Sequence, residues 1–256
     1  MKFISKLETR WAHSNSLLCV GLDPQLDRIP EHFKKQNSPY FDFCKAIVEA
    51  THELVCCFKP QVAYFSAVGA EDQLEKLVLY IKEEYPDIPV ILDAKRGDIG
   101  STAALYAKEA YERYGADAVT VNPYLGVESI EPYMKYEDKG IVVLCRTSNP
   151  GSDWLQKDKK DSVPVYQRVA KQVADWNKED QFVLVTGATY PEELGEVRKI
   201  VGRMPLLVPG IGAQGGDVKS VLEVGLDQKA QGLIISSSRE ILYAHERSDS
   251  DRQLDS

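Results

Sequence analysis

The chain has 256 residues, of which 43% are hydrophobic and 27% charged, so it is long enough to bury a large core. Its net charge of -8 argues against non-specific binding to nucleic acid, which depends on basic surface. The net charge does not exclude binding of an anionic small ligand, because a few cations or backbone amides suffice to bind one phosphate.

Residues 1–15 are mixed in polarity and lack the long apolar segment of a signal peptide. No stretch of the chain approaches the length of a membrane span. The five cysteines form no CxxC pair and lie in apolar segments, which predicts buried reduced thiols rather than disulfides or a zinc site. We therefore expect a cytoplasmic protein that does not enter a membrane.

Eight short apolar runs recur along the chain, each followed by a polar or glycine-rich turn. Their continuous apolarity is typical of parallel strands that are covered on both faces. The predicted strands are 17–21, 55–58, 90–92, 118–121, 141–144, 182–185, 206–208 and 233–235.

Helical patterns separate these runs, at 40–54, 70–84, 102–114, 164–176 and 191–201. Ser101 is the predicted N-cap of the third helix, and the last two begin with proline, which suits a first helical turn. Alternating strands and helices predict an α/β protein with a parallel sheet, and eight units at this length favour a single (β/α)8 TIM barrel over residues 1–246. An open doubly wound sheet is the alternative, but no GxGxxG follows the first run.

Two segments stand outside this pattern. Residues 247–256 are polar without apolar periodicity, which predicts a disordered tail. Residues 148–163 form the longest turn and contain Pro150, Gly151 and the charge run 157–161. This turn is either a solvated loop or a lid over bound substrate.

Charged residues follow the second and third predicted strands, at the end of a barrel where active sites lie. Asp93 and Lys95 are two residues apart and so share a face of their strand, with Asp98 just beyond. Lys59 comes from the neighbouring strand, so we expect two cations and two carboxylates to form an alternating array. An ion-pair network that closes the top of the barrel is the structural alternative.

Such an array suits a reaction in which a substrate loses a carboxylate. Two like charges about 4 Å apart repel by roughly 4 kcal/mol at an effective dielectric near 20. A substrate carboxylate placed against Asp93 would escape that repulsion by leaving as CO2. The adjacent Lys95 would stabilise the developing carbanion and then protonate it.

The loops after the seventh and eighth strands form the usual phosphate site of a barrel. Gly210, Gly212 and Gln214 fit that role, because glycine-rich backbone lets amide groups approach an anion closely. Ser238 and Arg239 follow the eighth strand, and Arg239 supplies a fixed charge. A tight structural turn is the alternative.

Other strand-end residues suit the rest of a ligand. Asp23 is a candidate acceptor for sugar hydroxyls, and either Thr147 or Ser148 is a candidate for contact with a base edge. The sequence predicts no metal site, since none of the histidines lies at a strand end or has a partner at metal-ligand spacing. These are His13, His32, His52 and His245.

The segment DAKRGDIGST at 93–102 resembles the active-site signature of the orotidine 5′-phosphate decarboxylase family, in the longer of its two main subfamilies. DxKxxD alone is also found in related sugar-phosphate barrels, but the resemblance extends in order over most of the chain. It continues through VGLDP at 20–24, FKPQ at 58–61, NPYLG at 122–126, RTSNPGS at 146–152, GATYP at 187–191, PGIGAQGGD at 209–217 and SSR at 237–239.

The resemblance implies a reaction without cofactor or metal, in which orotidine 5′-monophosphate (OMP) becomes UMP and CO2 in pyrimidine synthesis. It also implies a homodimer with shared active sites. Lys59, Asp93 and Lys95 would act in their own subunit's site, whereas Asp98 and Thr102 would serve the partner's.

Ligand contacts are implied as well. Asp23 would bind the ribose, Ser148 the pyrimidine, and Gln214 with Arg239 the phosphate. One departure lies after Lys59: the sequence reads Tyr-Phe-Ser at 64–66, where the family pattern leads us to expect an acidic third residue.

Three other interpretations compete. A metal-dependent barrel of the same wider group, such as a hexulose-phosphate synthase or a keto-gulonate-phosphate decarboxylase, needs a carboxylate at the end of the second strand, where Lys59 stands. A Schiff-base aldolase needs a neutral amine at Lys95, whereas the flanking Asp93 and Asp98 favour the charged form. A non-catalytic phosphate-binding barrel leaves the array unexplained.

Overall fold

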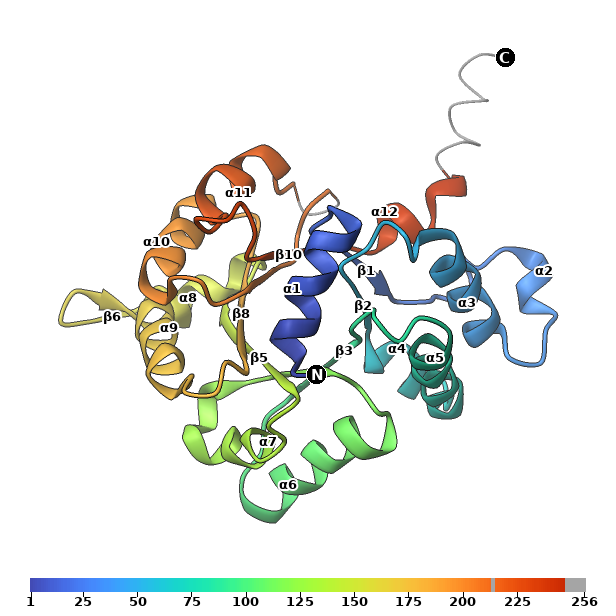
Figure 1. The fold of residues 1–256 in the computed structure, drawn as a ribbon, viewed down its shortest axis with the longest axis horizontal. Coiled ribbons are helices and arrows are strands. Elements are labelled where there is room, and N and C mark those ends of the chain that lie inside the picture. Colours follow the sequence, from blue (N-terminus) through green and yellow to red (C-terminus); the bar gives the residue numbers. More distant parts are fainter. Residues whose placement is uncertain (213–214, 247–256) are drawn as a thin grey trace.

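Eight parallel strands form the central sheet, in the order β2-β1-β10-β9-β8-β5-β4-β3 (Figure 1). The structure is a computed structural model that describes residues 1–212 and 215–246. Bridges from Phe58 to Val90 and from Gln61 to Asp93 join β2 to β3, so the sheet closes into the predicted (β/α)8 TIM barrel. The strands are β1 Leu18–Leu22, β2 Cys57–Pro60, β3 Ile91–Arg96, β4 Ala118–Val121, β5 Gly140–Arg146, β8 Phe182–Thr186, β9 Leu206–Val208 and β10 Leu233–Ser237.

All eight predicted strands are therefore present. The largest difference is in β3, which runs on to Arg96 instead of ending at residue 92. Its additional residues carry Asp93 and Lys95, so the charged residues lie within the strand and not after it. The predicted tail 247–256 lies outside the described residues.

Helices surround the sheet, and the five predicted ones are found as α3, α5, α6, α9 and α10 (Figure 1). The helices are α1 Phe3–Ser14, α2 Glu31–Lys34, α3 Pro39–Thr51, α4 Val62–Ser66, α5 Glu71–Glu84, α6 Gly100–Lys108, α7 Glu131–Met134, α8 Asp153–Gln156, α9 Val165–Trp176, α10 Pro191–Val201, α11 Val218–Gly225 and α12 Arg239–Leu242. Shorter turns are η2 Pro123–Leu125, η3 Val127–Ser129 and η4 Pro150–Ser152, and a π-helical turn, η1 Glu109–Arg113, continues α6.

The predicted N-cap at Ser101 is wrong. Helix α6 begins at Gly100, and the N-cap position is Ile99, whose extended backbone leads into the helix without a capping side chain. Gly100 has a φ of +58°, a conformation that glycine adopts without strain, so the chain turns into the helix before Ser101.

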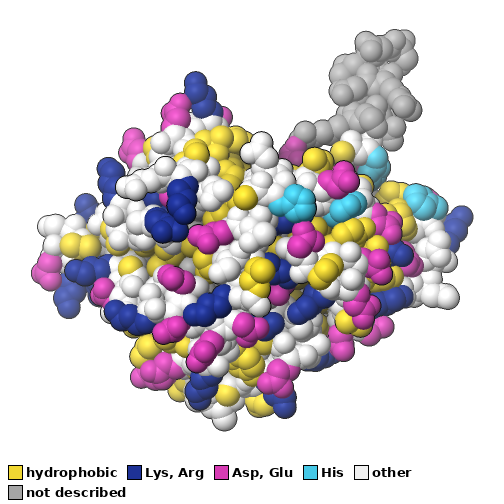
Figure 2. Space-filling view, viewed as in Figure 1, with side chains coloured by type: hydrophobic (Ala, Val, Ile, Leu, Met, Phe, Trp, Pro, Cys, Tyr) yellow, Lys and Arg dark blue, Asp and Glu magenta, His cyan; other side chains and the backbone are white. Residues whose placement is uncertain are grey.

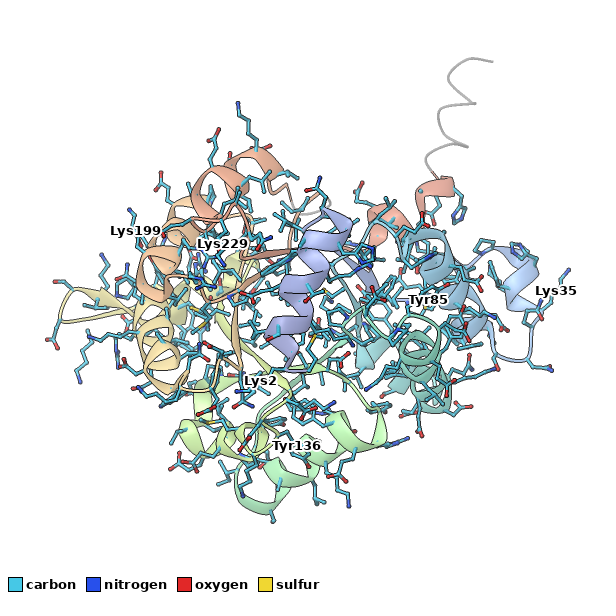
Figure 3. The ribbon with its side chains drawn as sticks, viewed as in Figure 1. Lys2, Lys35, Tyr85, Tyr136, Lys199 and Lys229 are labelled. Carbon is cyan, nitrogen blue, oxygen red and sulfur yellow. The ribbon has the colours of Figure 1, made fainter. Side chains whose placement is uncertain are left out.

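Helix α1 lies across the amino-terminal end of the barrel (Figure 1), although its sequence showed only mixed polarity. Phe3, Leu7 and Trp11 recur every four residues and are buried against the apolar side chains of the barrel interior. The Lys2 ammonium, labelled in Figure 3, donates to the Glu179 carbonyl at 3.1 Å and fastens the start of the helix. The helix therefore closes the barrel at the end opposite the strand carboxyl ends.

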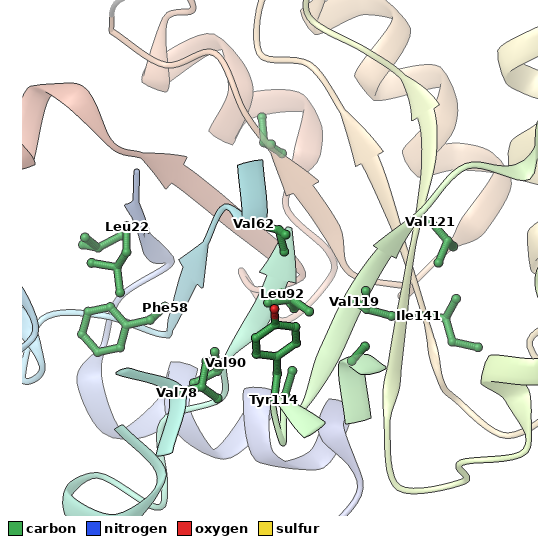
Figure 4. Packing of buried hydrophobic residues seen from close by; sticks show 14 of the residues in the cluster. Leu22, Phe58, Val62, Val78, Val90, Leu92, Tyr114, Val119, Val121 and Ile141 are labelled. Atoms are coloured by element: carbon green, nitrogen blue, oxygen red, sulfur yellow. The ribbon is translucent and has the colours of Figure 1, made fainter. Parts of the chain in front are cut away.

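Side chains along each strand alternate between the barrel interior and the surrounding helices. On β4, Val119 and Val121 belong to the outer core (Figure 4), whereas Ala118 points inward among apolar side chains near α1. One layer nearer the strand carboxyl ends, the inward positions hold Lys59, Asp93 and Thr120. The alternation that fills the barrel with apolar residues thus places polar ones above them.

The surface carries charges of both signs. Figure 2 shows acidic and basic side chains interspersed over the face that α1 crosses. Within residues 1–212 and 215–246, no helix is long and apolar enough to span a bilayer. All five cysteines are buried and unpaired, as the sequence predicted.

Candidate active site

A cavity of about 570 Å³ opens at the carboxyl ends of the strands, a volume in the range of small-molecule sites. Lys59, Asp93, Lys95 and Thr120 form its polar floor, and apolar side chains from β5, β8 and β9 complete the lining. Part of the segment 147–156 forms one wall. The cavity therefore joins the third strand's charged residues to the turn that follows β5.

Asp93 lies at the centre of the polar floor. Its Oδ2 is 3.0 Å from Nζ of Lys59, and its Oδ1 is 2.7 Å from Nζ of Lys95. The Thr120 hydroxyl donates to Oδ1 at 2.8 Å. The structure thus brings three of the four predicted charged residues together, with one carboxylate between two ammonium groups.

Burial and charge act in opposite directions on this array. Burial disfavours the charged form of Lys59, yet the carboxylates of Asp93 and Asp23 raise its pKa well above the usual range. Burial would likewise raise the pKa of Asp93, but Lys59 and Lys95 lower it well below the usual range. Asp93 is therefore an anion at neutral pH, and Lys59 is a cation. The Lys95 side chain differs from both, because 49% of its surface is exposed to the cavity and solvent.

Asp98 does not join the array. Its Oδ1 accepts a hydrogen bond from the backbone N–H of Ile99 at 2.8 Å, and the residue does not line the cavity. Thr102, on α6, is exposed and also lies outside the cavity. The expectation of four charges from one chain is therefore replaced by three, and Asp98 is partly buried outside the cavity.

Thr147 and Ser148 both line the cavity, so the structure brings each candidate for a base contact to the site. The Thr147 hydroxyl donates to Oδ1 of Asn149 at 2.7 Å and accepts from Nε2 of Gln156 at 3.0 Å. No described residue hydrogen-bonds to the Ser148 hydroxyl. Ser148 is therefore the better placed of the two to contact a ligand.

Asp23 and Ser238 lie together beside the floor. A Cβ atom added to Gly21 would come within 2.8 Å of the Ser238 Cβ and 3.4 Å of the Asp23 Oδ2, so only glycine fits between them. Asp23 Oδ1 and Ser238 Oγ are buried, and neither has a hydrogen-bond partner within the described part of the chain. Buried polar atoms are normally paired, so these two point to a bound polar ligand.

The loop after β9 is rich in glycine, which lets its backbone N–H groups approach an anion closely. Gly210 and Gly212 have φ values of +97° and +74°, which favour glycine. The N–H of Gly216 donates to the Gly210 carbonyl at 3.0 Å, so the loop folds back on itself. Arg239 begins α12, is exposed and forms no ion pair with a described residue. The fifth predicted phosphate residue, Gln214, lies outside the described residues.

The turn after β5 is folded rather than a plain loop. It contains η4, α8 and a hairpin of β6 Lys159–Lys160 with β7 Val163–Pro164. The fully buried Arg146 fastens its first half: the guanidinium is 2.6 Å from the Asp153 carboxylate and 2.5 Å from that of Glu193, and it also donates to Ser152. The half of the turn that borders the cavity is thus held from below by a buried arginine.

Several cavity residues were not among the predicted site residues. Thr120 interrupts the apolar run 118–121, a signal that could have singled it out. Gln156 and Asn149 had no such signal, because their placement depends on how the turn after β5 folds. Ser66, the departure from the family pattern, is exposed at the end of α4 and takes no part in the floor.

The described residues contain no group of three or more histidine, cysteine, aspartate or glutamate side chains placed to hold a metal ion. The fold and the cavity together define a (β/α)8-barrel enzyme with a lysine–aspartate–lysine array at the carboxyl ends of its second and third strands. The chain belongs to the orotidine 5′-phosphate decarboxylase / HUMPS family, whose model matches residues 16–253.

Relatives within this family are close. The chain is 56% identical to the orotidine 5′-phosphate decarboxylase of Janthinobacterium sp. (strain Marseille), over 95% of this chain and 90% of the relative. It is 57% identical to that of Dechloromonas aromatica (strain RCB), over 95% and 91%. The solved structure of Leishmania donovani OMP decarboxylase superposes with a TM-score of 0.86 at 37% identity, over 99% of this chain and 96% of that chain. The family resemblance predicted from the sequence is confirmed.

Proposed function

We propose that this protein is a carboxy-lyase that converts OMP to UMP and CO2 in cytoplasmic pyrimidine synthesis, without cofactor or metal. The observation that carries the proposal is the Lys59–Asp93–Lys95 array on the cavity floor, in a chain of this family. The unpaired buried thiols suit a reducing compartment.

The array supplies both halves of the reaction. Asp93 is held as an anion, so a substrate carboxylate about 4 Å away meets a repulsion of roughly 4 kcal/mol at an effective dielectric near 20. The bond from C6 to the carboxylate breaks, CO2 leaves, and the electron pair stays on C6. Lys95 stabilises that carbanion and transfers a proton to it from Nζ, after which the amine regains a proton from water. Lys59 keeps Asp93 ionised and in place.

Binding of the remaining substrate follows the positions of the other predicted residues. Ser148 lines the cavity, its hydroxyl has no hydrogen-bond partner among the described residues, and it would contact the pyrimidine. Asp23 Oδ1, which has no hydrogen-bond partner within residues 1–212 and 215–246, would accept from a ribose hydroxyl. The phosphate would be bound by Gly210, Gly212, Gln214, Ser238 and Arg239.

We further propose that the active enzyme is a homodimer in which Asp98 and Thr102 complete the partner's site. Both lie outside their own subunit's cavity. Apolar side chains flank them on the surface, because Ile99 is 55% exposed and Leu105 is 66% exposed. An exposed apolar surface around polar site residues suits an interface that brings those residues to a second cavity.

Mixing inactive Asp98→Ala and Lys95→Ala proteins is expected to restore activity. In a mixed dimer one site has an intact Lys95 and an intact partner's Asp98, whereas the other site has neither. With equal amounts and random subunit exchange, about half of the dimers are mixed, and each mixed dimer has one complete site out of two. The mixture should therefore show about a quarter of the wild-type activity per subunit. The rate of UMP formation after exchange measures this.

The matched control for that mixture is Lys59→Ala with Lys95→Ala. Both residues belong to one subunit's floor, so no mixed dimer has a complete site and the mixture should stay inactive. Continued inactivity of the Asp98→Ala and Lys95→Ala mixture, with subunit exchange demonstrated by co-purification of two tags, would rule out the shared site.

The rival interpretation is a metal-dependent sugar-phosphate barrel, a hexulose-phosphate synthase or keto-gulonate-phosphate decarboxylase. We expect the purified protein to consume OMP at the same rate with excess EDTA as without it. The absorbance of OMP measures this rate. Added magnesium should not raise the rate. Loss of activity in EDTA with recovery on adding magnesium, or turnover of a keto-sugar phosphate in place of OMP, would favour the rival.

A further inference from the structure

The Thr120 hydroxyl bonds both to the Asp93 carboxylate and to the backbone of Ala94 and Lys95 on the cavity floor. Thr120 is buried, lies on β4 opposite the charged end of β3, and lines the cavity. We infer that Thr120 is a positioning residue for decarboxylation, whose hydroxyl fixes Asp93 and presents Lys95 to the substrate. This inference rests on the proposed role of Lys95 as proton donor.

The pairing between β3 and β4 shows why a side chain is needed at this point. Leu92 pairs with Val119, and Arg96 pairs with Val121, so three residues of β3 lie opposite Thr120 alone. A regular ladder cannot satisfy the backbone N–H groups of such a bulge. The Thr120 hydroxyl takes the place of the missing carbonyl and accepts from the N–H of Ala94 at 2.9 Å and of Lys95 at 2.8 Å.

The same hydroxyl also holds the carboxylate. It donates to Oδ1 of Asp93 at 2.8 Å, the oxygen that lies 2.7 Å from Nζ of Lys95. A hydroxyl has one proton to donate and two lone pairs to accept with, so all three of these capacities are used. The direction of the bond to Asp93 is settled, because an ionised carboxylate only accepts.

Lys95 is held in an unusual backbone conformation at this bulge. Its φ is +45°, a value that side-chain-bearing residues adopt when their surroundings enforce it. Pairing with β4 resumes directly afterwards, since the N–H of Asn122 donates to the Arg96 carbonyl at 2.7 Å. Arg96 is itself fixed, with Nη2 2.9 Å from the Glu109 carboxylate. On the other side of β3, Asp93 bridges to Gln61, so the Thr120 hydroxyl is the contact that holds Ala94 and Lys95 on the β4 side of the bulge.

The test compares Thr120→Val, which keeps the side-chain shape but removes the hydroxyl, with Thr120→Ser, which keeps the hydroxyl. We expect Thr120→Val to lower kcat for OMP by about 100-fold, the scale of losing one preorganising hydrogen-bond donor, with KM changed by less than about threefold. Thr120→Ser should stay within about tenfold of the wild-type kcat. Thermal unfolding and UMP binding are measured for each variant, and Thr120→Cys replaces Thr120→Val if the latter does not fold.

A split between kcat and KM, with rescue by serine, supports positioning. Equal kcat values for folded Thr120→Val and Thr120→Ser, or losses that appear only in KM or in both variants alike, would overturn it. The wild-type protein is assayed alongside. If it does not consume OMP, the proposed function fails; if it does and Thr120→Val turns over equally fast, only the inference about Thr120 fails.

Discussion

Replacing Lys95 with alanine is expected to lower kcat for OMP decarboxylation by at least about 10⁴-fold, which combines the typical loss of a general acid with that of an electrostatic stabiliser. The physical reason is the position of its ammonium, 2.7 Å from Asp93 and open to the cavity. Without it the carbanion has neither a nearby cation nor a proton source. The rate of OMP loss by absorbance measures the effect.

The fold should survive this change, because half of the Lys95 side chain is exposed and Asp93 keeps its bond to Lys59. Lys45→Ala is the matched control: this lysine is also partly exposed and paired with a carboxylate, that of Glu49 at 3.7 Å, but lies on α3 away from the cavity. It should retain wild-type kcat. A Lys95→Ala protein with wild-type turnover would contradict the proposed mechanism.

Replacing Asp93 with asparagine is expected to destabilise the protein by about 3–5 kcal/mol at pH 7, as happens when one partner of a buried ion pair is removed. Lys59 and Asp93 are 8% and 9% exposed, so the substitution leaves the Lys59 ammonium buried without its main partner. Activity should be lost as well, because the carboxylate that repels the substrate is gone. Urea unfolding measures the free energy.

The pH dependence of the stability distinguishes the loss of the Lys59–Asp93 ion pair from a packing defect. In the wild type, the lowered pKa of Asp93 contributes stability that is present above about pH 4 and is lost as the pH falls through the folded value. The raised pKa of Lys59 contributes stability that is present below about pH 10 and is lost only as the pH rises through its folded value. Between these limits the contribution of the pair is constant.

In Asp93→Asn, burial of Lys59 is opposed chiefly by Asp23, so the pKa of Lys59 falls. The unfolded state then binds more protons than the folded state as the pH approaches about 10, and the variant regains stability relative to the wild type. The control is Asp175→Asn, at an exposed position on α9 with no partner among the described residues. If the difference in free energy of unfolding between Asp93→Asn and the wild type stays constant between pH 7 and pH 10, the ion-pair account is contradicted.

Local patterns in the sequence were sufficient for the barrel and for the centre of its site. Continuous apolar runs located all eight strands, because parallel strands are covered on both faces. The spacing of two predicted that Asp93 and Lys95 share a face, and both line the cavity with Lys59, although the bulge in β3 and the left-handed backbone of Lys95 depart from the regular alternation behind that prediction.

Other features depend on contacts between distant segments and could not be predicted locally. The position of Asp98 depends on where β3 ends and α6 begins. Thr120 stands out as the polar residue of the run 118–121, but its role comes from a bulge in the partner strand, which residue spacing does not reveal. The turn after β5 owes its shape to Arg146 and its ion pair with Glu193, 47 residues further on. Helix α1 was missed because its buried face combines three apolar residues spaced four apart, Phe3, Leu7 and Trp11, with the charged Arg10.

Chemical rescue of Lys95→Ala tests the central claim most directly, since that claim is that an ammonium group at this position delivers a proton. The truncated side chain leaves space at the edge of an open cavity for a small amine. Methylammonium should accelerate UMP formation by the variant, in proportion to its concentration, whereas tetramethylammonium, a cation without an acidic proton, should not. Equal acceleration by both ions would contradict proton donation by Lys95.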